Sequence, residues 1–242
     1  MDRIYGFPDS AKNFHLFEDD EGIKAHKEYK AAKQGDAKAA VTLVWDLASE
    51  YLHKLTGEFH EDVVYVSPFA REAGGDNAIP PMLVTACVIL MGGYGEDDIV
   101  QVERVYHTGA DPMERMSLRP SFEGAVIKGQ SYVLVDDVTN MGGTLAELAN
   151  YIILNGGEVA GSVVLCNAGR CKEFVPEKRV VKLLGERFGD EVKNIFGIRK
   201  EALTANEANY LIGFRSPDEI RNRLAKAKKE TVKRLRSKGI QR

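Results

Sequence analysis

The stretch VLVDDVTNMGGT, residues 133–144, decides the fold of this chain. An apolar run that begins at Tyr132 ends in Asp136 and Asp137, and a Gly-Gly-Thr turn follows a few residues later. A continuous apolar run of this kind is typical of a strand that is covered on both faces. Beyond the turn, apolar residues recur at helical spacing over 145–152. The pattern therefore predicts a strand, a short loop and a helix.

The paired acids and the glycines suggest a ligand. Open α/β sheets bind ligands at the carboxyl ends of their strands, and two charges placed there are costly unless something uses them. Strand alternation directs Asp136 and Asp137 to opposite sides, which suits separate tasks rather than one shared proton. Gly142 and Gly143 let backbone amides approach an anion at the start of the helix, and Thr144 adds a hydroxyl group. A phosphate beside a polyhydroxyl group describes a phosphorylated sugar.

These residues resemble the signature of the type I phosphoribosyltransferases, which has an apolar strand, two acids, an apolar pair and a Thr/Gly loop. The resemblance implies that Asp136 and Asp137 face the ribose hydroxyls of phosphoribosyl pyrophosphate (PRPP). The loop for its 5′-phosphate would consist of Thr139, Asn140, Met141, Gly142, Gly143 and Thr144. Asn140 and Met141 replace threonines that are usual in the family, and Thr139 replaces an apolar residue. Backbone amides would therefore carry more of the phosphate binding.

Two further segments extend the resemblance over roughly residues 60–170. DVVYVSPFAR at 62–71, followed by Gly-rich sequence, resembles the first core strand and pyrophosphate loop of the branch with ComF-like proteins and amidophosphoribosyltransferase domains. Pro68 ends the strand where that loop should begin. The resemblance places Ser67 among the PRPP-binding residues and offers the planar guanidinium of Arg71 to pyrophosphate. LRPSFEGA at 118–125, with Arg119, resembles the mobile segment of that branch.

The family implies a Mg²⁺-dependent enzyme that passes ribose 5-phosphate from PRPP to a nitrogen acceptor, such as a nucleobase or an amine, and releases pyrophosphate. Asp136 and Asp137 would hold the ribose and water molecules bound to the metal. The segment 112–124 would close over the site and exclude water, which is a competing acceptor. No motif identifies the acceptor. The resemblance implies a role in nucleotide metabolism. We also expect the protein to form a homodimer.

Composition agrees with an ordinary globular protein, since 44% of the 242 residues are hydrophobic and 29% are charged. The longest apolar stretch, 82–91, is about half of a membrane span, and the start lacks a signal pattern. We therefore expect a cytoplasmic protein with no membrane partner. The three cysteines form no Cys-x-x-Cys pair, so neither a disulfide framework nor a zinc site is indicated.

Alternating patterns predict a doubly wound α/β core with a mostly parallel sheet. Strands are expected at 63–66, 99–106, 132–135 and 162–165, and helices at 36–55, 81–90 and from 144 to the stop at Gly156. Trp45 falls on the apolar side of the first helix, which places it in the core. We expect a helical N-terminal segment and possible hood at 1–60, the core at 61–172 and a helical C-terminal extension at 173–242.

The C-terminal extension carries two capping boxes, Thr204 to Glu207 and Ser216 to Glu219, each of which predicts a helix start. Residues 216–242 contain ten Lys and Arg against three acids. A solvated terminal helix is the favoured explanation, and binding of nucleic acid is the alternative. A second hypothesis for the whole chain is a non-catalytic regulator that senses PRPP or a nucleotide, because a fold does not decide function. Both hypotheses predict PRPP binding, whereas only the enzyme releases pyrophosphate.

Overall fold

The computed structural model of the chain describes residues 1–70, 77–102 and 110–237. A five-stranded sheet in the order β1-β8-β7-β2-β4 forms its centre, and every neighbouring pair in it is parallel. Its strands are β1 (Lys12–Phe17), β8 (Glu158–Asn167), β7 (Ser131–Thr139), β2 (Val64–Val66) and β4 (Tyr94–Glu96). The predicted α/β class with a mostly parallel sheet is confirmed.

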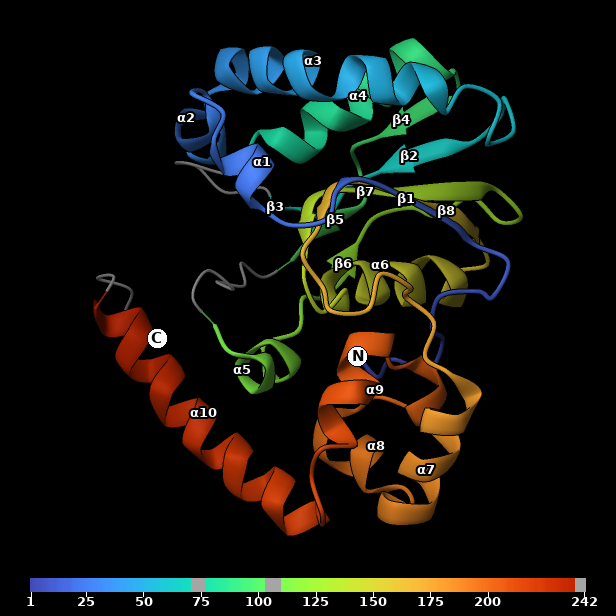
Figure 1. Cartoon of the computed structure of the whole chain (residues 1–242). Coiled ribbons are helices and arrows are strands. Elements are labelled where there is room, and N and C mark those ends of the chain that lie inside the picture. Colours follow the sequence, from blue (N-terminus) through green and yellow to red (C-terminus); the bar gives the residue numbers. More distant parts are fainter. Residues whose placement is uncertain (71–76, 103–109, 238–242) are drawn as a thin grey trace.

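Helices cover both faces of this sheet (Figure 1). On one face lie α1 (Glu21–Lys24), α2 (Tyr29–Lys33), α3 (Ala37–Lys54) and α4 (Ile79–Met91), and on the other lies α6 (Gly143–Leu154). Val133 and Val135 pack into the first layer, while Tyr132 and Leu134 pack into the second. The residues of β7 form a continuous apolar run because the strand packs against a hydrophobic core on each of its two faces.

A small second sheet, in the order β3-β5-β6, lies beside the main one. Its strands are β3 (Phe69–Ala70), β5 (Val100–Gln101) and β6 (Phe122–Glu123), and β6 is antiparallel to β5. Only the start of the strand expected at 99–106 is therefore observed, because 103–109 lie outside the described residues. The helix α5 (Pro112–Ser117) begins at a capping box formed by Asp111 and Glu114.

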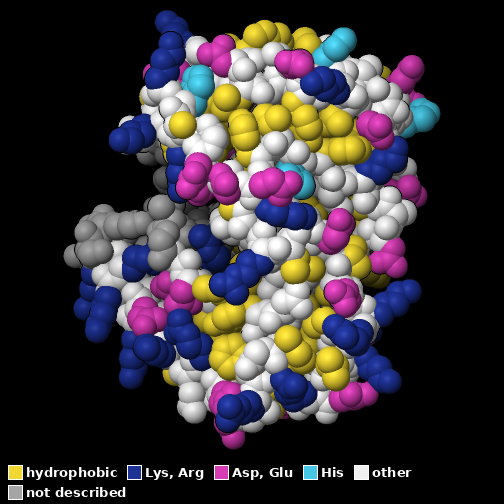
Figure 2. Space-filling view, viewed as in Figure 1, with side chains coloured by type: hydrophobic (Ala, Val, Ile, Leu, Met, Phe, Trp, Pro, Cys, Tyr) yellow, Lys and Arg dark blue, Asp and Glu magenta, His cyan; other side chains and the backbone are white. Residues whose placement is uncertain are grey.

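The C-terminal helices form a third core with α5, built around Met113, Leu184, Phe196 and Leu211. They are α7 (Lys178–Phe188), α8 (Glu191–Phe196), the 3₁₀ turn η1 (Lys200–Ala202), α9 (Ala205–Leu211) and α10 (Pro217–Ser237). The helix α10 runs along α5, and Figure 2 shows Lys and Arg side chains gathered along its outer edge, at the lower left. None of the helices in the described ranges is long and apolar enough to cross a membrane.

Two expectations from the sequence need correction. The first 60 residues are not only helical, because β1 forms an edge of the main sheet and pairs with β8 from Lys12 to Phe17. Trp45 is not in the core, since 44% of its surface is exposed on the outer side of α3. Alanines and smaller apolar residues such as Leu43 and Val44 fill the buried side of that helix instead. The domain limits at 60 and 172 remain a proposal.

Candidate functional site

A cavity of about 250 Å³, here called the loop cavity, lies at the carboxyl ends of β7 and β2. Its position follows from the fold, because parallel strands place their carboxyl ends, and the loops that follow them, on one edge of the sheet. The residues that line it come from α2, β5, β7, α6 and α9, from the segments around α5 and from the connections that follow β2 and β7. They are Lys33, Pro68, Asn77, Gln101, Arg115, Arg119, Pro120, 136–144, Glu147 and Glu207.

Asp136 and Asp137 both line the loop cavity and lie on opposite faces of β7, as the alternation of the strand predicts. The strand continues past them to Thr139, because β8 pairs with it as far as Asn167. Asp137 is 2% exposed, and its Oδ2 atom lies 2.6 Å from the Nζ atom of Lys33 on α2. The backbone N–H of Val138 donates to its other oxygen over 2.9 Å. One acid of the pair is therefore neutralised by a residue of the N-terminal segment.

The acids and Lys33 shift one another's ionisation. Burial, together with the adjacent charge of Asp137, raises the pKa of Asp136 well above its ordinary value. For Lys33, burial acts to lower the pKa, but the carboxylate of Asp137 outweighs it and the net pKa is raised. Lys33 is therefore protonated at neutral pH and Asp136 binds a proton readily. A cation or a set of hydroxyl donors placed beside Asp136 would favour its ionised form.

The loop between β7 and α6 presents an anion site. Within the described ranges, no hydrogen bond occupies the backbone N–H groups of residues 141–145. Gly142 has φ of +75°, a left-handed conformation that favours glycine, and it precedes the first turn of α6. Free N–H groups at a helix N-terminus attract phosphate through their dipoles and as donors. Thr144 lines the same cavity.

Two arginines of the segment around α5 line the loop cavity. The guanidinium of Arg119 lies 3.1 Å from Glu147 and donates to the carbonyl of Met1 over 2.7 Å. Arg115 uses its Nε–H to bind the carbonyl of Ala110 over 3.0 Å. Among the described residues, the lining holds four carboxylates (Asp136, Asp137, Glu147 and Glu207) and three cations (Lys33, Arg115 and Arg119), a formal charge of minus one.

Two of the expected site residues are not among the described residues that line the loop cavity. Arg71 lies outside the described residues. Ser67 is 5% exposed and lines a different, larger cavity of about 710 Å³ between α2, α4 and β4, whereas its neighbour Pro68 lines the loop cavity. The other residues expected to bind PRPP, namely Asp136, Asp137, Arg119 and 139–144, are brought together around one cavity.

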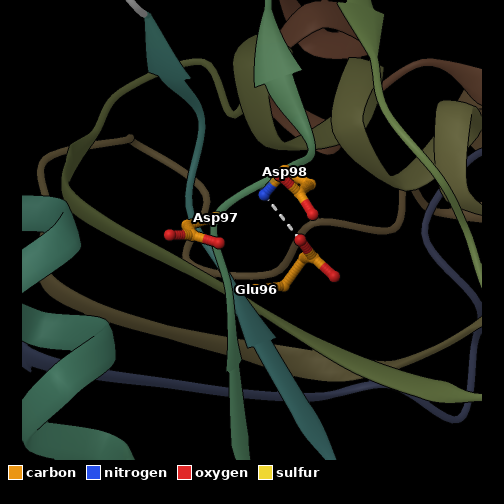
Figure 3. A group of neighbouring side chains, drawn as sticks. All are labelled: Glu96, Asp97 and Asp98. Carbon is orange, nitrogen blue, oxygen red and sulfur yellow. Dashed lines mark hydrogen bonds between the residues drawn. The ribbon is translucent and has the colours of Figure 1, made fainter.

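Three consecutive acids at the end of β4 form a separate cluster, shown in Figure 3. Carboxylate oxygens of Glu96, Asp97 and Asp98 lie within 4.8 Å of one another, and the backbone N–H of Asp98 donates to Glu96 over 2.6 Å. Glu96 and Asp97 line the larger cavity beside Ser67. Exposed acidic groups of this kind are common without a metal, so we assign this cluster no ligand.

Sequence reasoning missed several residues of the loop cavity. Lys33, Arg115 and Glu147 carry no motif that could identify them, because they reach the cavity only through the packing of α2, α5 and α6. Glu207 did have a signal, since its capping box with Thr204 is evident in the sequence and is observed at the start of α9. What the sequence did not indicate is that this helix start contacts the loop.

Comparisons with known proteins agree with the geometry. The chain is 39% identical to protein TraN of Escherichia coli over 216 residues, which cover 86% of this chain and 48% of TraN. It thus spans about half the length of that relative. A 57-residue part, 24% of this chain, is 44% identical to orotate phosphoribosyltransferase of Campylobacter concisus (strain 13826) and covers 27% of that protein.

Solved structures give a weaker likeness. Adenine phosphoribosyltransferase from Thermoanaerobacter pseudethanolicus ATCC 33223 aligns with a TM-score of 0.35 and 20% identity, over 57% of this chain and 74% of that chain. This score is too low to bear on function. The ComF-like branch also stays a prediction, because the comparisons point to the family and not to a branch. Residues 94–197 match the family model described as "Phosphoribosyl transferase domain". This stretch of the chain is therefore similar to a phosphoribosyl transferase domain.

Proposed function

We propose that this protein is a Mg²⁺-dependent phosphoribosyltransferase that transfers ribose 5-phosphate from PRPP to a nitrogen acceptor and releases pyrophosphate. One observation carries the proposal. The acids Asp136 and Asp137 line the same cavity as residues 141–144, whose backbone N–H groups have no hydrogen-bond partner within the described ranges. Such a site offers donors to a phosphate and acceptors to sugar hydroxyls within one ligand's length.

In this proposal the 5′-phosphate binds the loop from Thr139 to Thr144, and the ribose hydroxyls donate to Asp136 and Asp137. Arg115 and Arg119 line the same cavity, and we propose that they contact the pyrophosphate group. The carboxylates also stabilise the positive charge that develops on the ribose as the bond to pyrophosphate breaks. Ser67 and Arg71 stay in the proposal as pyrophosphate-side residues.

The donor set fits Mg²⁺, which prefers carboxylate oxygens, water and substrate phosphates. Asp136 provides a carboxyl group with a raised pKa, and Asp137 provides an oxygen whose only close partner in the described ranges is an ammonium group. When bound, the metal would neutralise the developing charge on pyrophosphate. Lys33 would hold Asp137 in place before the ligand arrives.

We further propose that residues 1–60 contribute the acceptor hood, residues 61–172 the core and residues 173–242 a supporting helical extension. Lys33 supports the first assignment, because α2 already places this side chain at the cavity wall. A homodimer is part of the same proposal. The acceptor is left as the class of nitrogen nucleophiles.

Two measurements on the intact chain test the function. Saturating Mg²⁺ and PRPP should stabilise the folded protein by about 2.7 kcal/mol at a hundredfold excess over Kd, or roughly 5–10 °C in Tm. Pyrophosphate release should then appear with one member of a panel of nucleobases, ammonia and amines. Binding of PRPP without release for any acceptor would favour the sensor hypothesis instead. The same assays on Asp137→Asn should give little thermal shift.

A further inference from the structure

The phosphate loop is held by the side chain of Thr204, the N-cap residue of α9. Thr204 is 2% exposed, and its hydroxyl group donates to the carbonyl oxygen of Met141 over 2.5 Å. The hydroxyl oxygen of Thr204 in turn accepts a hydrogen bond from the backbone N–H of Glu207 over 3.2 Å, which is the capping interaction expected at a helix start. One hydroxyl group therefore caps α9 and fixes a carbonyl of the loop.

Glu207 extends this contact to the N-terminal arm. Its Oε2 atom accepts the backbone N–H of Thr204 over 2.9 Å and forms an ion pair with Arg3, which is fully buried. Arg3 also donates a long hydrogen bond, 3.4 Å, to the carbonyl of Gly143. The arm is fixed in turn by backbone hydrogen bonds on both sides of Arg3, to Gly197 and Arg199. We call Thr204, Glu207 and Arg3 the loop brace.

The geometry of the peptide bond determines where these contacts direct the N–H groups of the loop. In a trans peptide the C=O and the N–H of the same unit point in opposite directions, and no cis peptide occurs in the described ranges. Thr204 holds the carbonyl of Met141, so the N–H of Gly142 must point away from α9. Arg3 acts in the same way on the unit that joins Gly143 to Thr144. Both N–H groups belong to residues that line the loop cavity.

We propose that Thr204, Glu207 and Arg3 are positioning residues that orient the N–H groups of Gly142 and Thr144 toward the phosphate of the substrate. The proposal rests on the proposed function and adds to it a role for two segments, the first residues of the chain and the start of α9. Electrostatics agree, because Arg3 neutralises Glu207 close to the place where an anion binds. A preorganised loop binds phosphate without the cost of ordering it.

The decisive variant is Thr204→Val, which preserves shape and removes the hydroxyl group, compared with Thr204→Ser, which restores that group. We expect Thr204→Val to weaken binding of Mg²⁺–PRPP and of inorganic phosphate roughly tenfold, the usual scale for one buried hydrogen bond. The variant should raise the KM for PRPP and leave kcat within about twofold, because the phosphate contact is made equally in the ground and transition states. Thr204→Ser should stay within about twofold of wild type in every parameter.

Ser216→Ala is the matched control, since Ser216 caps α10 through the backbone N–H of Glu219 and is not part of the loop cavity. It should lower Tm without changing PRPP affinity. The NMR order parameter of the Gly142 amide is a second readout, which needs no ligand. It should be near 0.85, the approximate value of rigid backbone, in wild type and below about 0.6 in Thr204→Val. Thr204→Ala carries the same test if the valine variant does not fold.

The proposal would be overturned if wild type and Thr204→Val had equal PRPP affinity and equal order parameters at Gly142. It would also be overturned if Ser216→Ala lost as much PRPP affinity as Thr204→Val. Failure of the proposed function would look different. In that case the wild-type protein would bind neither PRPP nor phosphate, while the order parameter of Gly142 would still decide whether Thr204 orients the loop.

Discussion

Replacing Lys33 by methionine should destabilise the protein, because it leaves the carboxylate of Asp137 buried without its cation. Asp137 is 2% exposed. Without Lys33, the hydrogen-bond donor to its carboxylate within the described ranges is the backbone N–H of Val138. Removing one partner of a fully buried ion pair costs about 3–5 kcal/mol. The side chain of Lys33 is 33% exposed, so water screens the pair and the expected loss is smaller, about 2–3 kcal/mol. For a chain of this size that is a fall in Tm of roughly 4–12 °C.

Urea denaturation at neutral pH and physiological salt measures this loss directly. Lys30→Met is the control, since Lys30 is an exposed residue of the same helix and its replacement should change stability by less than about 0.5 kcal/mol. The double variant Lys33→Met with Asp137→Asn should recover most of the loss, giving a coupling energy above about 1 kcal/mol. If Lys33→Met costs no more than Lys30→Met, the ion pair contributes nothing and the account of the neutralised acid is wrong.

Three further predictions concern the acids, the loop and the basic helix. Burial raises the pKa of Asp136 in the folded protein above its pKa in the unfolded chain. The unliganded protein therefore loses stability as the pH rises from the pKa of the unfolded state toward the pKa of the folded state. Asp136→Asn should therefore raise Tm at neutral pH while weakening Mg²⁺–PRPP binding, and an unchanged or lower Tm would contradict this. Gly142→Ala should cost about 1–2 kcal/mol in urea denaturation and most of the PRPP affinity, because φ is +75° and the added methyl would lie 2.8 Å from the ring of Phe174. Any binding of RNA through α10 should disappear as the salt concentration rises from about 50 to 200 mM. It should also disappear when Lys228, Lys229 and Lys233 are all replaced by Gln. Binding that persists near 150 mM salt would support the regulatory hypothesis.

The strand, the loop and the helix of the signature could be predicted because each depends on residues that are close together in the sequence. Apolar runs indicated β7 and β8, and glycines indicated both the loop and the end of α6. The strand β1 was not predicted, because its residues, KNFHLF, have neither clean alternation nor a buried run. Its place depends on pairing with β8, about 150 residues further along the chain.

The same distinction separates the predicted site residues from the missed ones. The acids and the loop belong to one local motif, whereas Lys33 reaches Asp137 and Arg3 reaches Glu207 only after the chain has folded. A lone Lys or Arg gives no signal in a single sequence, since most such residues are solvated. The capping box at Thr204 predicted a helix start, but it could not predict the hydrogen bond from Thr204 to Met141, because the sequence does not show what lies next to the cap.

The most direct test of the central claim is a titration of the intact protein with PRPP in the presence of Mg²⁺, monitored by isothermal calorimetry. The account predicts saturable binding by wild type and by Thr204→Ser, weaker binding by Thr204→Val, and little or none by Asp137→Asn. Addition of a suitable nitrogen acceptor to the same mixture should release pyrophosphate. If wild type at millimolar PRPP gives neither heat of binding nor a change in Tm, the loop cavity is not a PRPP site and the proposed function is wrong.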